Sequence, residues 1–254
     1  MFPLTHTLVA QNIISKDDPQ VVFGGVFPDL AHGIGLNRDV THEMGEDFYR
    51  FCREHDRSFL DFARAVISHG AKPPGLDYYA DQSFEGKKHG YCFQRAVPLV
   101  EKVIKTCALP PQMGLWKAHN FIEMAFEVIT VELNPVLPDQ FLAALEDEAI
   151  LKGCSDVLGC YFGINRARIF EAFQRMPDFF CLHDVTAVNL AKKYAMQLRK
   201  RHGVLKADPQ GMTEVLEEAR KIVSEEYSSF IRDAENKISL LLSQYPRDPR
   251  AKKD

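Results

Sequence analysis

The sequence lacks the cysteine patterns of a zinc ribbon and of a small disulfide scaffold. Its six cysteines form no CxxC pair, and a chain of 254 residues can build a core without disulfides. We therefore expect reduced thiols that pack mostly in the core. The cysteines are Cys52, Cys92, Cys107, Cys154, Cys160 and Cys181.

Long apolar runs and an excess of basic charge are also missing. No run of about 18 apolar residues occurs, so we expect no transmembrane segment. A net charge of −4 does not indicate a surface that wraps nucleic acid. The opening stretch MFPLTHTLVAQN has no basic leader and no small-residue cleavage site, which predicts a cytoplasmic protein.

The sequence does contain helical periodicity along most of its length, and no segment shows the alternation of a strand. In residues 59–70, FLDFARAVISHG, the apolar residues share one face with His69, and Gly70 is the predicted stop. Residues 208–245 keep one apolar stripe and are predicted as a single long helix. We expect an all-α, multi-helix bundle, with a metal-binding core over 1–134 and a helical extension over 135–254, or one single domain.

Histidines gather in the first half of the chain. Seven of the nine histidines lie between residues 6 and 119, and residues 1–134 also hold an excess of acidic over basic residues. His119 and Glu123, in the apolar stretch KAHNFIEMAFEV, stand four residues apart and share one face of a helix. Buried polar groups need partners. The two side chains either bond to each other or share a divalent metal.

Carboxylates stand close in sequence to these histidines. The candidates are Asp29, Asp77, Asp81 and Glu123. Mixed histidine and carboxylate ligation suits zinc, iron, manganese or nickel rather than calcium. Each residue also has a structural interpretation, for example Asp29 as a turn residue and His69 as a partner of the helix dipole. One shared metal site explains the whole set more simply.

The order of these residues resembles the zinc-dependent phospholipase C family, which forms a wider group with the fungal single-strand nucleases. The similarity covers about residues 1–130. The order of the motifs along the chain is more specific than any single motif. The matching pieces are LTHTL (His6), FPDL (Asp29), VTHEM (His42), VISHG (His69), LDYYAD (Asp77, Asp81), KKHGY (His89) and AHNFIE (His119, Glu123).

This resemblance implies an all-α fold of phospholipase C/nuclease type that holds two or three divalent ions, most readily zinc. It implies hydrolysis of a small phosphate ester or a phospholipid by a metal-activated water. It also implies a distribution of ligands over the ions. Asp29, His42 and His69 would hold one ion, His89, His119 and Glu123 a second, and His6 a third.

Two points of the resemblance concern aspartates. The family places a bridging aspartate four residues after the histidine of the SH pair, where this chain has Pro73. Either Asp77 or Asp81 would take its place from a loop. Asp29 is the candidate that orients or deprotonates the attacking water, again by analogy with the family.

Other functions fit parts of the sequence. The dipeptides His55–Asp56 and His183–Asp184 would suit an HD-type phosphohydrolase, and Pro73 favours a non-catalytic helical module that binds a metal or a partner. The basic stretch LRKRHG, residues 198–203, is interpreted as a solvated helix end. The predicted helix over 208–245 would cover the core or form a homodimer contact.

Overall fold

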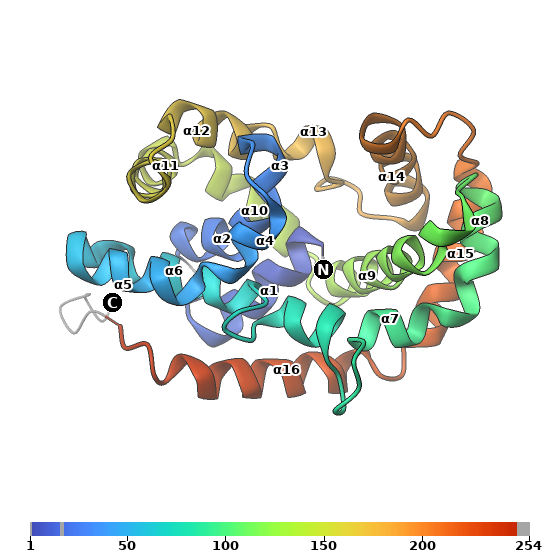
Figure 1. The fold of residues 1–254 in the computed structure, drawn as a ribbon, viewed down its shortest axis with the longest axis horizontal. Coiled ribbons are helices and arrows are strands. Elements are labelled where there is room, and N and C mark those ends of the chain that lie inside the picture. Colours follow the sequence, from blue (N-terminus) through green and yellow to red (C-terminus); the bar gives the residue numbers. More distant parts are fainter. Residues whose placement is uncertain (1, 16–17, 248–254) are drawn as a thin grey trace. The chain divides into compact units, whose positions relative to one another are not determined.

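A computed structural model describes residues 2–15 and 18–247 of the chain. These residues form helices and no strand; Phe84 and Lys87 make an isolated bridge (Figure 1). The all-α prediction is confirmed. Contacts divide the chain into two compact units, each of which combines segments from before and after residue 134. The division therefore does not follow the boundary predicted there.

Unit 1 is organised around one long, buried helix. It comprises Met1–Thr5, Tyr79–Pro138 and Pro177–Phe230. Its central helix α9 (Gly114–Leu133) is buried over most of its circumference, and Phe121 and Phe126 are fully buried. The helices that pack on α9 are α7 (Tyr91–Ala96), α8 (Val100–Thr106), α14 (Ala187–His202) and α15 (Pro209–Val223) (Figure 1).

Unit 2 contains a group of helices that includes the apolar helix α2. It comprises His6–Tyr78, Asp139–Met176 and Ile231–Asp254. Helix α2 (Pro19–Val26) packs against α6 (Leu60–His69) and α11 (Glu148–Phe162). The other helices include α3 (Ala31–Ile34), α4 (Arg38–Glu43), α5 (Gly45–His55) and α12 (Arg166–Gln174).

Several elements contain residues of both units. They are α1 (Pro3–Ile13), η3 (Tyr78–Gln82), α10 (Leu137–Glu146), α13 (Met176–Phe179) and α16 (Tyr227–Leu242). Short 3-10 turns complete the described secondary structure. These are η1 (Phe27–Leu30), η2 (Arg57–Phe59), η4 (Val97–Leu99) and η5 (Pro111–Met113).

The prediction of one helix over 208–245 is wrong, because the chain turns after α15 and begins α16 at Tyr227. The turn contains Glu226, which receives hydrogen bonds from Arg95 Nε at 2.7 Å and from the Tyr91 hydroxyl at 2.8 Å. No glycine or proline occurs in residues 224–226. The helical spacing of apolar residues therefore does not reveal that the helix is interrupted between α15 and α16.

Two further predictions bear on the environment of the chain. All six cysteines are free thiols, and all but Cys160 are buried, as expected. Among the helices of the described residues, none has both the length and the apolar character needed to cross a bilayer.

Candidate metal centres

His42 and His69 are oriented by main-chain carbonyls of unit 2. His42 Nδ1 lies 2.8 Å from the carbonyl oxygen of Arg38, and His69 Nδ1 lies 2.6 Å from that of Gly25. A carbonyl oxygen only accepts, so Nδ1 carries a proton in both rings. This arrangement directs Nε2 inward, as is typical of metal-binding histidines.

The two Nε2 atoms converge with two carboxylate oxygens. The two Nε2 atoms lie 3.3 Å from each other. His42 Nε2 is 3.6 Å from Asp29 Oδ1 and 3.2 Å from Asp77 Oδ2. His69 Nε2 is 3.9 and 3.7 Å from the same two oxygens. Ligands that lie about 2.1 Å from a tetrahedral ion are roughly 3.4 Å from one another. His42, His69 and Asp77 are thus spaced like three ligands of one ion, and His6, Asp29 and His69 form a second set that overlaps the first at His69.

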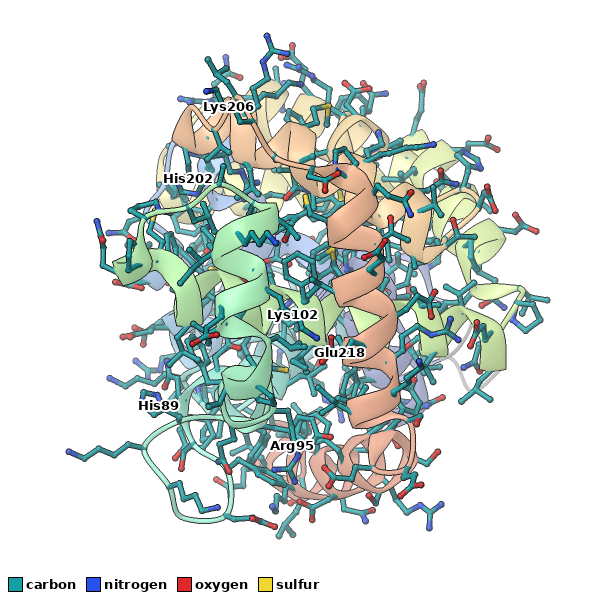
Figure 2. All side chains as sticks on the ribbon, turned by 90° about the vertical axis from the view of Figure 1, so that its right-hand side faces the viewer. His89, Arg95, Lys102, His202, Lys206 and Glu218 are labelled. Atoms are coloured by element: carbon teal, nitrogen blue, oxygen red, sulfur yellow. The ribbon has the colours of Figure 1, made fainter. Side chains whose placement is uncertain are left out.

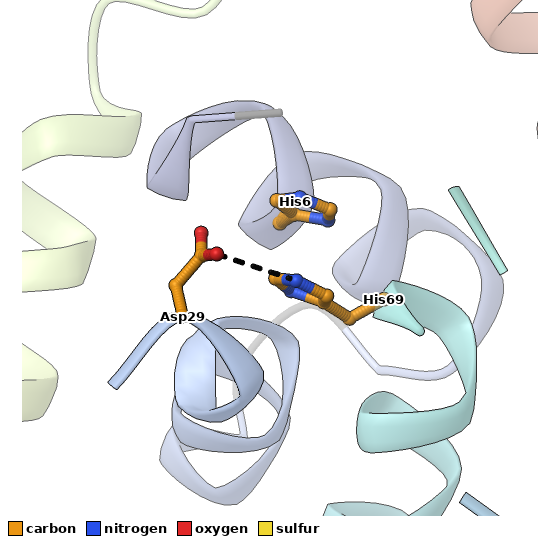
Figure 3. A group of neighbouring side chains, drawn as sticks. All are labelled: His6, Asp29 and His69. Carbon is orange, nitrogen blue, oxygen red and sulfur yellow. Dashed lines mark ion pairs between the residues drawn. The ribbon is translucent and has the colours of Figure 1, made fainter. Parts of the chain in front are cut away.

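His6 adds a third imidazole to this group. Its ring stacks on that of His69, with centroids 3.5 Å apart and an interplanar angle of 10°. Figure 3 shows these two rings together with Asp29, which forms an ion pair with His69. His6 Nε2 lies 3.2 Å from Oδ1 of Asp77, the oxygen that does not face the other two histidines. Asp77 therefore has the geometry of a carboxylate that bridges two cation positions.

The backbone after α6 delivers Asp77 to the group. Gly75 N donates to the carbonyl of Gly70 at 2.9 Å, which folds the segment back over the end of the helix. A Cβ on Gly75 would collide with the carbonyl oxygens of Ile67, Ser68 and Gly70, so the close approach requires glycine. Of the two aspartates left open by the sequence, Asp77 is the one that joins the His42–His69 pair.

The group opens to solvent on one side. The side chains of His6, His42, His69 and Asp77 are at most 2% exposed, whereas that of Asp29 is 22% exposed. Arg38 Nη2 lies 2.8 Å from Asp77 Oδ2, and its side chain is 52% exposed. An anionic molecule that approaches Asp29 would therefore also meet a guanidinium.

The charges of the group are strongly coupled. Burial lowers the pKa of His42, but its contacts with Asp29 and Asp77 outweigh burial and raise the pKa to about 9. Burial holds the pKa of His69 well below its usual range. Burial alone would raise the pKa of Asp77, whereas nearby positive charge and the contacts with its histidines lower the pKa well below the ordinary value. In the absence of a metal, the proton on His42 therefore provides the positive charge beside Asp29 and Asp77 that a metal cation would otherwise provide.

A second group lies within unit 1. One ligand atom each from Asp81, His119 and Glu123 lie within 4.8 Å of one another. His119 and Glu123 are 7% and 6% exposed and come from α9, so the prediction that they share a buried face is confirmed. The ring of Phe93 stacks on His119 with centroids 4.1 Å apart. This group offers one imidazole and two carboxylates, a set that also suits a divalent ion.

Asp81 reaches the second group from η3. The Gly90 N–H donates to the Asp81 carbonyl oxygen at 2.9 Å, so the chain returns onto η3 after the loop over residues 83–89. A Cβ on Gly90 would overlap the backbone of Ala80 and Asp81. The two aspartates that the sequence offered as alternatives thus belong to two different groups.

His89 is the predicted ligand that the structure leaves aside. It is exposed and contacts the ring of Phe93 at 5.8 Å between centroids. No group with metal-binding geometry among the described residues includes it. In the second group, Asp81 stands in the place that the resemblance gave to His89.

The HD dipeptides also lie outside both groups. His55 is exposed, and its Nδ1 contacts the carbonyl of Phe51 at 3.0 Å. Asp56 accepts hydrogen bonds from Ser58 as the N-cap of η2. Asp184 accepts a hydrogen bond from the side chain of Asn189. These contacts are those of turns and helix ends.

Glu127 is a buried carboxylate that the sequence analysis did not select. It is 1% exposed and accepts hydrogen bonds from the backbone N–H groups of Leu4 and Thr5, both at 2.9 Å, and from the Thr5 hydroxyl at 2.8 Å. Burial raises its pKa to about 7. Glu127 lies four residues after Glu123 on α9. This helical spacing is the only feature of the sequence that could have indicated a buried carboxylate there. Its role is to hold the first turn of α1.

Compared with known proteins, the chain matches no family model, no curated protein and no solved structure. The two groups are therefore interpreted from their own geometry. Each lies within one unit, and each combines imidazole with carboxylate. The first consists of two sets that share His69, namely His42 with His69 and Asp77, and His6 with Asp29 and His69, and the second has one histidine and two carboxylates.

Proposed function

We propose that this chain is a metal-dependent hydrolase of phosphate esters, with a fold and ligand order of the phospholipase C/nuclease type. The observation that supports it most is the convergence of Nε2 of His42 and His69 on carboxylate oxygens of Asp29 and Asp77, at nitrogen–oxygen distances of 3.2 to 3.9 Å. The donor set fits zinc best and also suits iron, manganese or nickel.

The residues of the first group have separate roles in this proposal. A divalent ion bound there would supply a water of lowered pKa and a positive charge for a phosphate oxygen. His42 and His69 hold the ion, and the carbonyls of Arg38 and Gly25 fix their rings. Contact with His42 lowers the pKa of Asp29 against the effect of burial, so Asp29 is a carboxylate at neutral pH. From the open side of the group it accepts a hydrogen bond from the attacking water and orients it.

The charge at the open side favours an anionic substrate. Arg38 presents an exposed guanidinium beside Asp77, and a guanidinium binds phosphate oxygens well. A phosphate ester would bring its non-bridging oxygens between Arg38 and the ion. A neutral ester would gain nothing from Arg38, and this difference is why we favour phosphate esters over carboxylic esters.

The test is metal analysis followed by a substrate panel. Purified protein is loaded with zinc, manganese or nickel and assayed on phosphomonoesters and phosphodiesters. We expect hydrolysis with at least one metal, and its loss in His42→Ala and His69→Ala. His55→Ala serves as the control, because it removes an exposed imidazole outside both groups.

Two results would separate the alternatives. Metal-loaded protein that is inactive on the whole panel would contradict the hydrolase and leave a non-catalytic metal-binding module. Loss of metal in His55→Ala or Asp56→Ala would instead indicate an HD-type site. No described contact of these two residues favours that outcome.

A further inference from the structure

The end of α14 and the segment after it carry four exposed cations, of which Lys200 has its Nζ 4.9 Å from the centre of the Phe179 ring. Arg199, Lys200, Arg201 and Lys206 are exposed, and no carboxylate of the described residues pairs with any of them. Some other exposed cations of unit 1 are paired, such as Lys102 with Glu218 at 2.5 Å. Figure 2 shows this pair between α8 and α15, with His202 and Lys206 near one end of the view. A solvated helix end explains part of this charge, but Lys206 lies beyond the helix.

Two exposed apolar side chains lie with these cations. Leu205 is 76% exposed, more than any other large apolar side chain that is described, and Trp116 is 49% exposed. Trp116 is fixed to the end of α14, because its ring meets that of His202 edge-on with centroids 5.6 Å apart. Lys117 Nζ lies 3.6 Å from the centre of the Trp116 ring and 2.9 Å from His202 Nε2. Trp116, Leu205, Arg201 and Lys206 form what we call the α14 patch; Arg201 is the cation of α14 that acts electrostatically on both Lys117 and His202.

We propose that the α14 patch binds the surface of an anionic lipid bilayer. Tryptophan is enriched at the level of the lipid headgroups, and the transfer of an exposed leucine side chain from water into the acyl region is favourable. Unpaired lysine and arginine side chains are attracted to anionic headgroups. The whole chain has a net charge of −4, so this positive charge is local and directs one face to the membrane.

Other anionic partners fit the patch less well. A nucleic acid would use the cations and stack on Trp116, but it would leave Leu205 in water. An acidic protein would need a shape that the patch does not define. The inference does not depend on hydrolysis, because every residue of the patch lies in unit 1 and none belongs to a candidate metal group.

The chain contains its own probe for this binding. Trp116 is the only tryptophan among 254 residues, so the fluorescence of the intact protein reports on the patch. The protein is titrated with vesicles of phosphatidylcholine alone and of phosphatidylcholine mixed with phosphatidylserine. We expect a blue shift with the mixed vesicles only, quenching by brominated acyl chains, and weaker binding at high salt.

Variants separate charge from insertion. Each cation near an anionic surface strengthens binding by about fivefold, so Arg201→Gln with Lys206→Gln should weaken it by about 25-fold. Leu205→Ser should weaken it by about tenfold without changing the charge. The matched control is Lys87→Gln with Lys88→Gln, which removes the same charge from an exposed loop of unit 1. Circular dichroism of each variant verifies that the helices remain.

Three results would overturn the proposal. One is a Trp116 spectrum that mixed vesicles leave unchanged. Another is vesicle binding that Leu205→Ser does not weaken, because binding would then be electrostatic alone. The third is tight binding of heparin or single-stranded DNA without any binding to vesicles, which would identify the patch as a polyanion site.

Discussion

The two candidate metal groups differ in how their histidines are held. In the first, backbone carbonyls of Arg38 and Gly25 fix the rings of His42 and His69. In the second, His119 lies against the ring of Phe93 and brings two carboxylates with it. The first group is richer in nitrogen, and the second is richer in oxygen. We therefore expect tighter binding of zinc in the first and easier exchange with manganese in the second.

The largest effect is expected from Asp77→Asn. Asp77 contacts His6, His42 and Arg38, so its charge supports the whole first group. We expect metal affinity to fall by more than about 100-fold, since even outer partners of ligands are worth tenfold or more. Calorimetric titration and metal analysis measure this. The control Asp39→Asn, an exposed carboxylate in α4, should bind like the parent protein.

His119→Ala tests whether the groups are independent. It removes the imidazole of the second group and leaves every residue of the first. We expect a loss of about one ion per chain, with the ion of the first group retained. Metal analysis of the dialysed variant gives the count. If all bound metal disappeared, the distinction between two groups would be refuted.

Thr41→Val tests the support of the first group. The Thr41 hydroxyl lies 2.8 Å from the carbonyl of Pro28, the residue before Asp29, and 3.0 Å from that of Arg38, which holds His42. Its removal should weaken metal binding by about tenfold. The matched control is Thr106→Val, whose hydroxyl bonds to the carbonyl of Lys102. An equal effect in both variants would argue against this role.

The protonation of His42 makes metal binding depend on pH. The pKa of His42 is raised to about 9, so at about pH 7.5 the ring is charged and an ion must displace its proton. We expect release of about one proton per ion at the first group, and an affinity that rises with pH until about 9. In the metal-free protein, the same contact stabilises the fold below about pH 6.5 and is lost as pH rises through about 9.

Calorimetry in buffers of different ionisation enthalpy measures the released proton. His119→Ala is the protein to use, because it leaves the first group as the principal site. Binding without proton release would show that His42 is neutral in the free protein.

The smallest effect is expected from His89→Ala. The structure leaves this exposed histidine outside both groups, so its removal should change neither metal content nor affinity. The phospholipase C resemblance predicts the opposite. Metal analysis beside His119→Ala decides between them, and a lost ion in His89→Ala would favour the resemblance over the geometry.

Sequence reasoning was most successful where a residue lies on a helix. The pairing of His119 with Glu123 follows from their spacing, and His69 lies on the apolar face of the helix predicted over residues 59–70. Residues of loops were less predictable. The sequence left Asp77 and Asp81 as alternatives and favoured His89 as a ligand. The backbone contacts at Gly75 and Gly90 place these segments, and such contacts produce no periodic pattern of apolar residues that could be recognised in the sequence.

The loop that carries Asp77 also bears on how such proteins are found. His69 and Asp77 are separated along the chain by a segment that doubles back at Gly75. A motif with a fixed gap between the two ligands would pass over this chain, although the donor atoms meet in space. Catalogues that index pairs of donor atoms by distance, and ignore how many residues intervene, would retrieve it together with chains whose loops have other lengths.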